Sequence, residues 1–255
     1  MAEKNSLYEA LQDRQREDAL RRRRILTEEL RWKLSEPMRS RVDARGIRHL
    51  VHFTPIENVE SILRIGLRSR NALAGVPFIC TDEQRFDGGL DWISFSVSFP
   101  NCGMFWKKRV FVKKNVAGWA VLLIRKEALW ELDCRFVPTN AACVGVREFQ
   151  EDGYSSVKAF ERMFTEAERS KCIPDSFTTD PQAEVMIRNE VPKKYIDKIA
   201  VQCDSDKQLI RNCKNVIVEP ISELFKMRSD YDSWRWRSLK QPSNQNGFDV
   251  PCFSF

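Results

Sequence analysis

The sequence predicts an α+β fold, with a largely antiparallel or mixed sheet in the middle and helices at its periphery. Segments typical of strands dominate between residues 48 and 201, whereas segments with helical spacing of apolar residues lie around them. With 255 residues and 42% hydrophobic content, the chain can bury one sizeable core. We therefore expect one domain over residues 46–225, a basic helical extension over 1–45, and a tail over 226–255 packed on the domain.

The N-terminal extension is rich in Arg and Glu and has leucines at helical spacing, and Pro37 is expected to end its helix. The run Arg21 to Arg24 stands out within it. One interpretation is an arm that contacts nucleic-acid phosphates, because each basic residue displaces condensed counterions. The other is a solvated helix face that nearby acidic residues partly balance.

A strand is predicted over residues 48–53, and a helix directly after it. Thr54 is expected to cap this helix, with a proline at the first helical position and Glu57 three residues after the cap, as in a capping box. Gly66 is expected to end the helix in a left-handed conformation. His52 and Thr54 would then lie at a junction between strand and helix.

Further elements follow from the pattern of apolar residues. Residues 93–99 alternate strictly between apolar residues and serines, which predicts a half-buried strand. Residues 119–124 are apolar throughout, which favours a central strand. Additional strands are predicted over 183–187 and 196–201, and helices over 157–169 and 206–213.

Several classes of protein are disfavoured by what the chain lacks. The sequence contains neither G-x-G-x-x-G nor G-x-x-x-x-G-K, so the common nucleotide-binding loops are absent. Eight cysteines without a C-x-x-C pair predict reduced thiols rather than a zinc site or disulfides. No apolar run is long enough to span a bilayer, so we expect a cytoplasmic protein. A net charge of +6 permits a polyanionic partner.

Four short segments, in this order along the chain, resemble the DarT family of NAD-consuming DNA ADP-ribosyltransferase toxins. The run from His52 to Leu63 resembles the family's opening, H-[IF]-T-x-[IV]-x-N-[LV]-x-x-I-L. Glu83-Gln84-Arg85 lies where the family carries an arginine before a strand, here Trp92 to Phe99. Gln182-Ala183-Glu184, with Val191-Pro192 downstream, resembles the later Q-A-E strand. The resemblance covers approximately residues 48–220.

The resemblance implies a split sheet of the ADP-ribosyltransferase type, with NAD as co-substrate and no metal. Glu184 and Arg85 are the implied catalytic residues. The implied NAD-binding residues are His52, Phe53, Thr54, Asn58, Gly66 and Arg85. An imidazole and a hydroxyl suit this task because both can donate and accept hydrogen bonds, and a guanidinium fork suits a pyrophosphate or an acceptor base. Asn58 has the alternative of being a polar residue on a helix face.

Glu184 has a clear chemical task in such an enzyme. Cleavage of the bond between nicotinamide and ribose builds oxocarbenium character at the anomeric carbon, and a fixed carboxylate stabilises that transition state. The same group can orient the acceptor or take its proton. Gln182 is expected on the same face of the strand, two residues earlier. In protein-modifying enzymes that the chain resembles, a glutamate at this position favours arginine targets, so the resemblance implies that Gln182 disfavours an arginine acceptor.

The acceptor is expected to be a base in single-stranded DNA. The implied contacts with nucleic acid are Asn101, Met104, Lys107, Lys108, Arg109 and Gln182. The family pattern R-[ST]-P-M reads Asn101-Cys102-Gly103-Met104 here, and this departure leaves thymine and guanine both open. Phe105 and Trp106 either stack on bases or pack in the core. The mixture of arginine and tryptophan from Arg228 to Arg237 forms either a docking helix or a covered edge.

The sequence therefore predicts an NAD-dependent ADP-ribosyltransferase that modifies a nucleobase as a bacterial toxin or phage-defence effector. By resemblance, a macrodomain-type antitoxin is the expected partner. One alternative is an enzyme on the same scaffold that modifies RNA or protein. Another is a non-catalytic nucleic-acid-binding module. No interaction with a membrane is expected.

Overall fold

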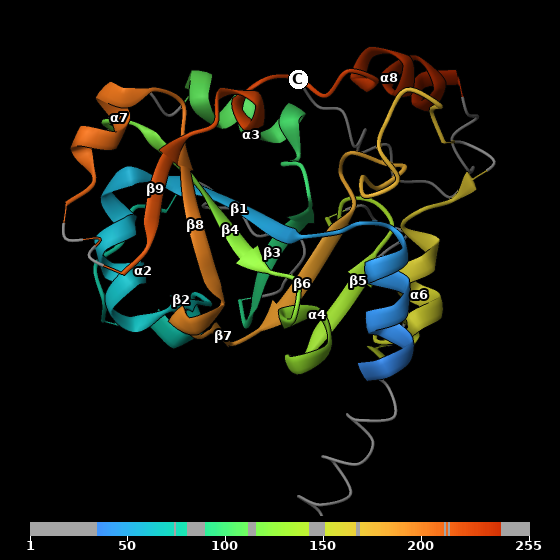
Figure 1. Cartoon of the computed structure of the whole chain (residues 1–255), viewed down its shortest axis with the longest axis horizontal. Coiled ribbons are helices and arrows are strands. Elements are labelled where there is room, and N and C mark those ends of the chain that lie inside the picture. Colours follow the sequence, from blue (N-terminus) through green and yellow to red (C-terminus); the bar gives the residue numbers. More distant parts are fainter. Residues whose placement is uncertain are drawn as a thin grey trace, which may run out of the picture.

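The protein is described by a computed structural model over residues 35–240, except positions 74, 81–89, 112–115, 143–150, 167–168, 212 and 214. A seven-stranded sheet in the order β5-β6-β3-β1-β4-β8-β9 forms its centre (Figure 1). Neighbouring strands are antiparallel except β8 and β9, which are parallel. The strands are β1 (His49–Pro55), β3 (Trp92–Val97), β4 (Trp119–Arg125), β5 (Cys134–Val137), β6 (Glu184–Arg188), β8 (Ile196–Val201) and β9 (Ile217–Pro220). The predicted α+β class is confirmed.

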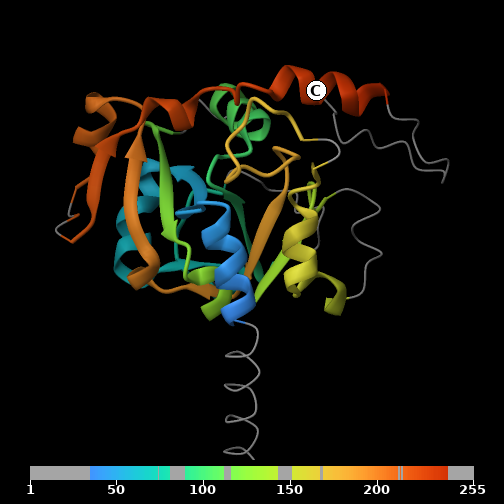
Figure 2. The same cartoon turned by 45° about the vertical axis from the view of Figure 1, so that its right-hand side comes forward.

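Helices surround this sheet. They are α2 (Val59–Ile65), α3 (Cys102–Phe111), α4 (Ala128–Glu131), α6 (Val157–Arg162), α7 (Asp204–Leu209) and α8 (Tyr231–Lys240). Short 3-10 helices are η1 (Ile56–Asn58), η2 (Asn71–Leu73), η4 (Glu151–Tyr154), η6 (Lys193–Tyr195) and η7 (Ser222–Phe225), and β2 (Leu67–Arg68) pairs with β7 (Glu190–Val191). A further helix over residues 35–44 lies beside α6, and α3 and α8 lie at the same end of the sheet (Figures 1 and 2).

Apolar side chains cover both faces of the central strands. Leu50 and Leu122 belong to the larger core cluster, whereas their neighbours Val51 and Val121 belong to a second cluster with Phe105. Because successive side chains of a strand point to opposite faces, a strand covered on both sides must be apolar throughout. This arrangement confirms the central strand predicted over residues 119–124.

The helix over residues 35–44 continues past Pro37, so the prediction that this proline ends it was wrong. A proline removes one N–H donor, but the turns after it can still form. The helix ends instead at residue 44, just before Gly46, whose φ is 65°. Its N–H donates to the Asp43 carbonyl, and the Ile47 N–H donates to the Val42 carbonyl, as in a Schellman motif.

The capping box predicted at Thr54 was also wrong. β1 continues to Pro55, and α2 begins only after η1. The Glu57 carboxylate accepts a hydrogen bond from the Ala117 N–H at 2.6 Å, which attaches it to the segment before β4. Gly66 does end α2 as predicted. Its φ is 84°, and its N–H donates a hydrogen bond to the Ile62 carbonyl oxygen.

Two helices are shorter than predicted. α6 ends at Arg162 rather than at residue 169. The Thr165 hydroxyl donates a hydrogen bond to the Arg162 carbonyl oxygen, and the Thr179 N–H donates to the Met163 carbonyl oxygen. α7 occupies Asp204–Leu209 instead of 206–213. α6 therefore stops where groups outside the helix satisfy its last carbonyl oxygens.

Candidate active site

The central sheet opens between β1 and β3. β1 pairs with β4 along all of its length, from His49 to Pro55, but it pairs with β3 only at Leu50 and Val51. Beyond this point the His52 ring bridges the two strands, with Nδ1 2.9 Å from the Ser94 carbonyl oxygen. Since a carbonyl can only accept, Nδ1 is the donor. The separation of the two strands creates the split that the sequence predicts for an ADP-ribosyltransferase.

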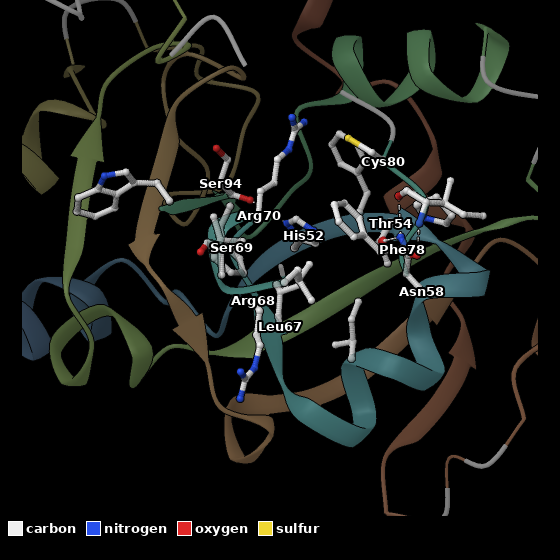
Figure 3. A pocket seen from close by; sticks show the side chains of 18 of the residues that line it. His52, Thr54, Asn58, Leu67, Arg68, Ser69, Arg70, Phe78, Cys80 and Ser94 are labelled. Carbon is white, nitrogen blue, oxygen red and sulfur yellow. Dashed lines mark hydrogen bonds between the residues drawn. The ribbon is translucent and has the colours of Figure 1, made fainter. Parts of the chain in front are cut away.

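A cavity of about 300 Å³ occupies this split. His52 and Thr54 of β1 and Ser94 of β3 line it (Figure 3). Ser96 of β3 and Glu184, the first residue of β6, line it as well. Glu184 is 9% exposed, so its carboxylate lies at the inner wall rather than on the surface. The imidazole and the carboxylate expected at one site therefore share one cavity, although β1 and β6 are far apart in the sequence.

Thr54 and Asn58 form a brace at the cavity wall. Asn58 Nδ2 donates to Thr54 Oγ1 at 3.1 Å and to the Ile79 carbonyl at 3.0 Å, and Asn58 Oδ1 accepts from the Ile79 N–H at 2.8 Å (Figure 3). Because Thr54 Oγ1 accepts here, its hydroxyl hydrogen can be donated to a ligand. Asn58 lines the cavity, but its amide holds the segment around Ile79 in place.

Gly66 also lines the cavity, and its position there requires a glycine. A Cβ at this position would lie 2.8 Å from the carbonyl oxygen of Val191, and the φ of 84° is left-handed. Only glycine combines this conformation with so close an approach. The approach brings β2 against β7 next to the cavity.

Helix α3 forms another wall, and Asn101 caps it. Its Oδ1 accepts from the Met104 N–H at 3.1 Å, and its own N–H donates to Ser96 Oγ at 3.0 Å. Asn101, Met104 and Lys108 line the cavity. Phe105 is buried and stacks on Phe53, with ring centroids 4.6 Å apart, so the core-packing interpretation of Phe105 is correct.

Comparison with known proteins agrees with this geometry. A family model described as "ssDNA thymidine ADP-ribosyltransferase, DarT" matches residues 92–226, which is more than half of the chain. The chain belongs to the DarT family. This match confirms both the resemblance and the enzyme class that it implies. The search of curated proteins produced no match.

A solved DarT structure has a similar fold. The DarT of Thermus sp. 2.9 in complex with ADP-ribosylated ssDNA superposes with a TM-score of 0.53 and 15% identity, over 71% of this chain and 97% of that chain. The same enzyme in complex with NAD+ gives 0.49 and 17%, over 69% and 96%. Thermosipho africanus DarTG in complex with ADP-ribose gives 0.48 and 18%, over 70% of this chain but only 51% of that chain.

The DarT model match begins at Trp92, so it does not include β1. In the tertiary structure, however, β1 lies between β3 and β4, which both belong to the matched region. His52, Phe53 and Thr54 therefore lie against the matched part of the chain at the cavity.

Two of the residues expected to contact nucleic acid, Lys107 and Arg109, do not line the cavity. Arg109 donates to the Phe225 carbonyl at 2.6 Å and to Gln202 Oε1 at 2.7 Å, and burial lowers the pKa of its guanidinium. These bonds connect α3 to η7 and to the residue after β8, and the expected contact of Arg109 with nucleic acid stays a prediction.

Gln182 does not share a strand face with Glu184, which corrects the sequence prediction. β6 starts at Glu184, and Gln182 lies in the preceding turn, where its N–H donates to Asp180 Oδ1 at 2.7 Å. The alternation of a strand therefore does not apply to this pair, and Gln182 is not part of the cavity lining. Arg85 lies outside the described residues.

Sequence analysis missed several residues that line the cavity. They are Arg68, Ser69, Arg70, Ser94, Ser96 and Asn140. The alternation of residues 93–99 did carry a signal for the serines, since a polar strand face can line a site as well as face solvent. Arg68 and Arg70, which follow Gly66 closely in the sequence, carried a weaker signal.

The charges around the cavity favour an anionic ligand. Among the described residues that line it, Arg68, Arg70 and Lys108 are basic and Glu184 is acidic, and Arg68 also pairs with Glu190 at 3.5 Å. Among the described residues, no group of three or more side chains could hold a metal ion. Within the same part of the chain, no helix is long and apolar enough to cross a membrane.

Proposed function

We propose that this DarT family member transfers ADP-ribose from NAD to a base of single-stranded DNA, with thymidine as the first acceptor to test. The observation that carries the proposal is the common cavity of His52, Thr54 and Glu184, with basic side chains around it. The family description supports the reaction and the acceptor. We further propose action in the cytoplasm as a toxin, with a macrodomain-type antitoxin that removes the modification.

In this mechanism, His52 and Thr54 bind the nicotinamide riboside half of NAD. The Thr54 hydroxyl can donate because its oxygen already accepts from Asn58, and the His52 ring is oriented by its bond to Ser94. Arg70 approaches the pyrophosphate and balances part of its negative charge. The Arg68 guanidinium instead pairs with Glu190 at 3.5 Å, and its side chain points away from His52 (Figure 3). Arg85 is proposed to assist there, although it lies outside the described residues.

Glu184 stabilises the positive charge that develops on the ribose as the glycosidic bond breaks. The electron pair of that bond leaves with nicotinamide. A ring nitrogen of the acceptor base attacks the anomeric carbon, and Glu184 takes the proton that this nitrogen loses. A nearly buried carboxylate suits both steps because few water molecules compete with it.

The acceptor strand is proposed to approach along α3. Met104 and Lys108 line the cavity, and Phe111 lies one turn further on the same side of the helix, with 76% of its surface exposed. An exposed aromatic ring next to a lysine suits stacking on one base and contact with its phosphate. Lys107 is proposed as an additional phosphate contact.

Mass spectrometry of oligonucleotides tests the proposal. Purified wild type and Glu184→Gln are incubated with NAD and single-stranded oligonucleotides that contain either thymine or guanine as the only candidate acceptor. We expect an added ADP-ribosyl mass on the thymine oligonucleotide with wild type, and at least about 100-fold less with the variant. Circular dichroism controls for the folding of the variant.

Parallel reactions with RNA and with protein distinguish the alternatives. Label that appears only in RNA or protein would refute the DNA acceptor, while the enzyme class would stand. Retention of DNA without any release of nicotinamide would identify a non-catalytic binding module.

A further inference from the structure

The C-terminal segment contains a buried ion pair. Arg228 Nε lies 2.6 Å from Asp230 Oδ1, and Arg228 Nη2 lies 2.9 Å from Asp230 Oδ2, with each side chain only 2% exposed. The remaining donors of the guanidinium reach the carbonyl oxygens of Thr178 at 2.7 Å and Thr179 at 3.1 Å. The pair therefore attaches the start of α8 to the segment that leads into β6.

That segment is tightly connected to Glu184. The Thr178 hydroxyl donates to the Asp180 carbonyl at 2.7 Å, and the same carbonyl accepts from the Ala183 N–H at 3.1 Å. Asp180 Oδ1 accepts a hydrogen bond from the Gln182 N–H. A continuous series of hydrogen bonds thus leads from Arg228 to the residue immediately before Glu184.

The same segment also touches the α3 wall of the cavity. Tyr231 packs on α3 at Gly103, where a Cβ would overlap the tyrosine hydroxyl. Gly103 directly precedes Met104, which lines the cavity. One short stretch after β9 therefore contacts both the approach to Glu184 and the helix on the acceptor side.

We propose that Arg228, Asp230 and Tyr231 form a clamp that positions Glu184 relative to α3, and that the clamp sets the rate of the chemical step rather than the affinity for NAD. This inference rests on the proposed function, because it takes Glu184 as the catalytic carboxylate. The clamp lies beyond residue 226, where the DarT family match ends.

The physical argument concerns what a buried ion pair contributes. Apolar residues of similar volume often stabilise a fold as well as such a pair does, because removing two charges from water is costly. A planar guanidinium fork does, however, fix two carbonyl oxygens and one carboxylate in a defined geometry. A catalytic carboxylate needs this kind of support, since small displacements reduce rates strongly.

The test replaces the pair as a unit. Arg228→Met combined with Asp230→Leu removes both charges and leaves no buried charge alone. The matched control is Glu223→Gln combined with Lys226→Met, which removes an ion pair of 2.6 Å from the same part of the chain, where both side chains are exposed. Arg228→Lys is a milder variant, because it keeps the charge but loses the fork.

We expect kcat for nicotinamide release in the presence of single-stranded DNA to fall at least about tenfold in the double variant, with KM for NAD within about threefold of wild type. Arg228→Lys should give an intermediate kcat. The control pair should leave both constants unchanged. A purely structural role would lower the melting temperature without lowering kcat below that temperature, and this outcome would overturn the clamp.

Hydrogen exchange provides a readout that does not depend on activity. The amides of Gln182 and Ala183 should exchange at least about tenfold faster in the double variant than in the control. Unchanged exchange there would refute the clamp even if the enzyme assay failed. An inactive wild type whose exchange pattern follows this expectation would instead refute the proposed function alone.

Discussion

His52 Nδ1 lies 2.9 Å from the backbone carbonyl oxygen of Ser94, at the point where β1 and β3 separate. The histidine thus has two tasks in the proposed function, because one ring nitrogen bridges the strands while the ring also lines the cavity. The two tasks can be separated experimentally, since an asparagine amide nitrogen can occupy the place of Nδ1 but not that of Nε2.

His52→Asn is expected to keep the bond to Ser94 and to lose the contact with NAD. The Kd for NAD, measured by calorimetry, should rise about two- to tenfold, which corresponds to one net hydrogen bond. The free energy of unfolding should stay within about 0.5 kcal/mol of wild type. His52→Ala should lose both the hydrogen bond to Ser94 and the contact with NAD. Equal NAD affinity in wild type and His52→Ala would exclude the histidine from the NAD site.

Gly66→Ala should be more destabilising than Gly75→Ala. Both glycines have left-handed φ, 84° and 80°, but only Gly66 has a backbone atom within 3 Å of the position of a Cβ. We expect a loss of about 1 kcal/mol at Gly75, from φ alone, and about 3 kcal/mol at Gly66. Urea unfolding measures both, and similar losses at the two positions would contradict the close approach to Val191.

Phe111→Ala should weaken binding of single-stranded DNA about tenfold, because loss of a stacking ring costs about 1–3 kcal/mol per base. Ile217→Ala is the control, since Ile217 is also well exposed, at 58%, but lies on β9. Fluorescence anisotropy with a labelled oligonucleotide measures both affinities. NAD binding should be unaffected in either variant. Identical DNA affinities for the two variants would argue against an acceptor path along α3.

The thiols should differ strongly in reactivity. Burial raises the pKa of Cys102, and burial beside Asp133 raises that of Cys134, whereas Cys172 and Cys203 are exposed. Since the thiolate is the reactive form, iodoacetamide should alkylate the exposed pair first and reach the buried pair only after denaturation. Peptide mass spectrometry of native and unfolded samples reads this out. Early alkylation of Cys134 would contradict its burial under native conditions.

Local pattern was sufficient for most of the strands. The alternation in β3, the apolar run of β4 and the glycine that ends α2 could be read directly, because each depends on neighbours in the sequence. Family motifs then brought His52 and Glu184 together in one hypothesis, and the structure places both at one cavity.

Two of the incorrect predictions concern groups whose hydrogen-bond partners differ from those that the sequence pattern indicated. Glu57 was expected to close a capping box, but it bonds to Ala117 across the fold. Gln182 was expected on a strand, but Asp180 holds it in a turn. A periodicity contains no information on such partners, since local alternatives of similar energy exist for each side chain.

The chain by itself thus determined the class of fold, the identity of most strands and the residues that mark the family, because these depend on periodicity and on short motifs. Tertiary structure alone decided where the sheet opens, which polar groups brace the cavity, and that Arg228 reaches the segment before Glu184. These features arise from hydrogen bonds between segments that meet only when the sheet has formed.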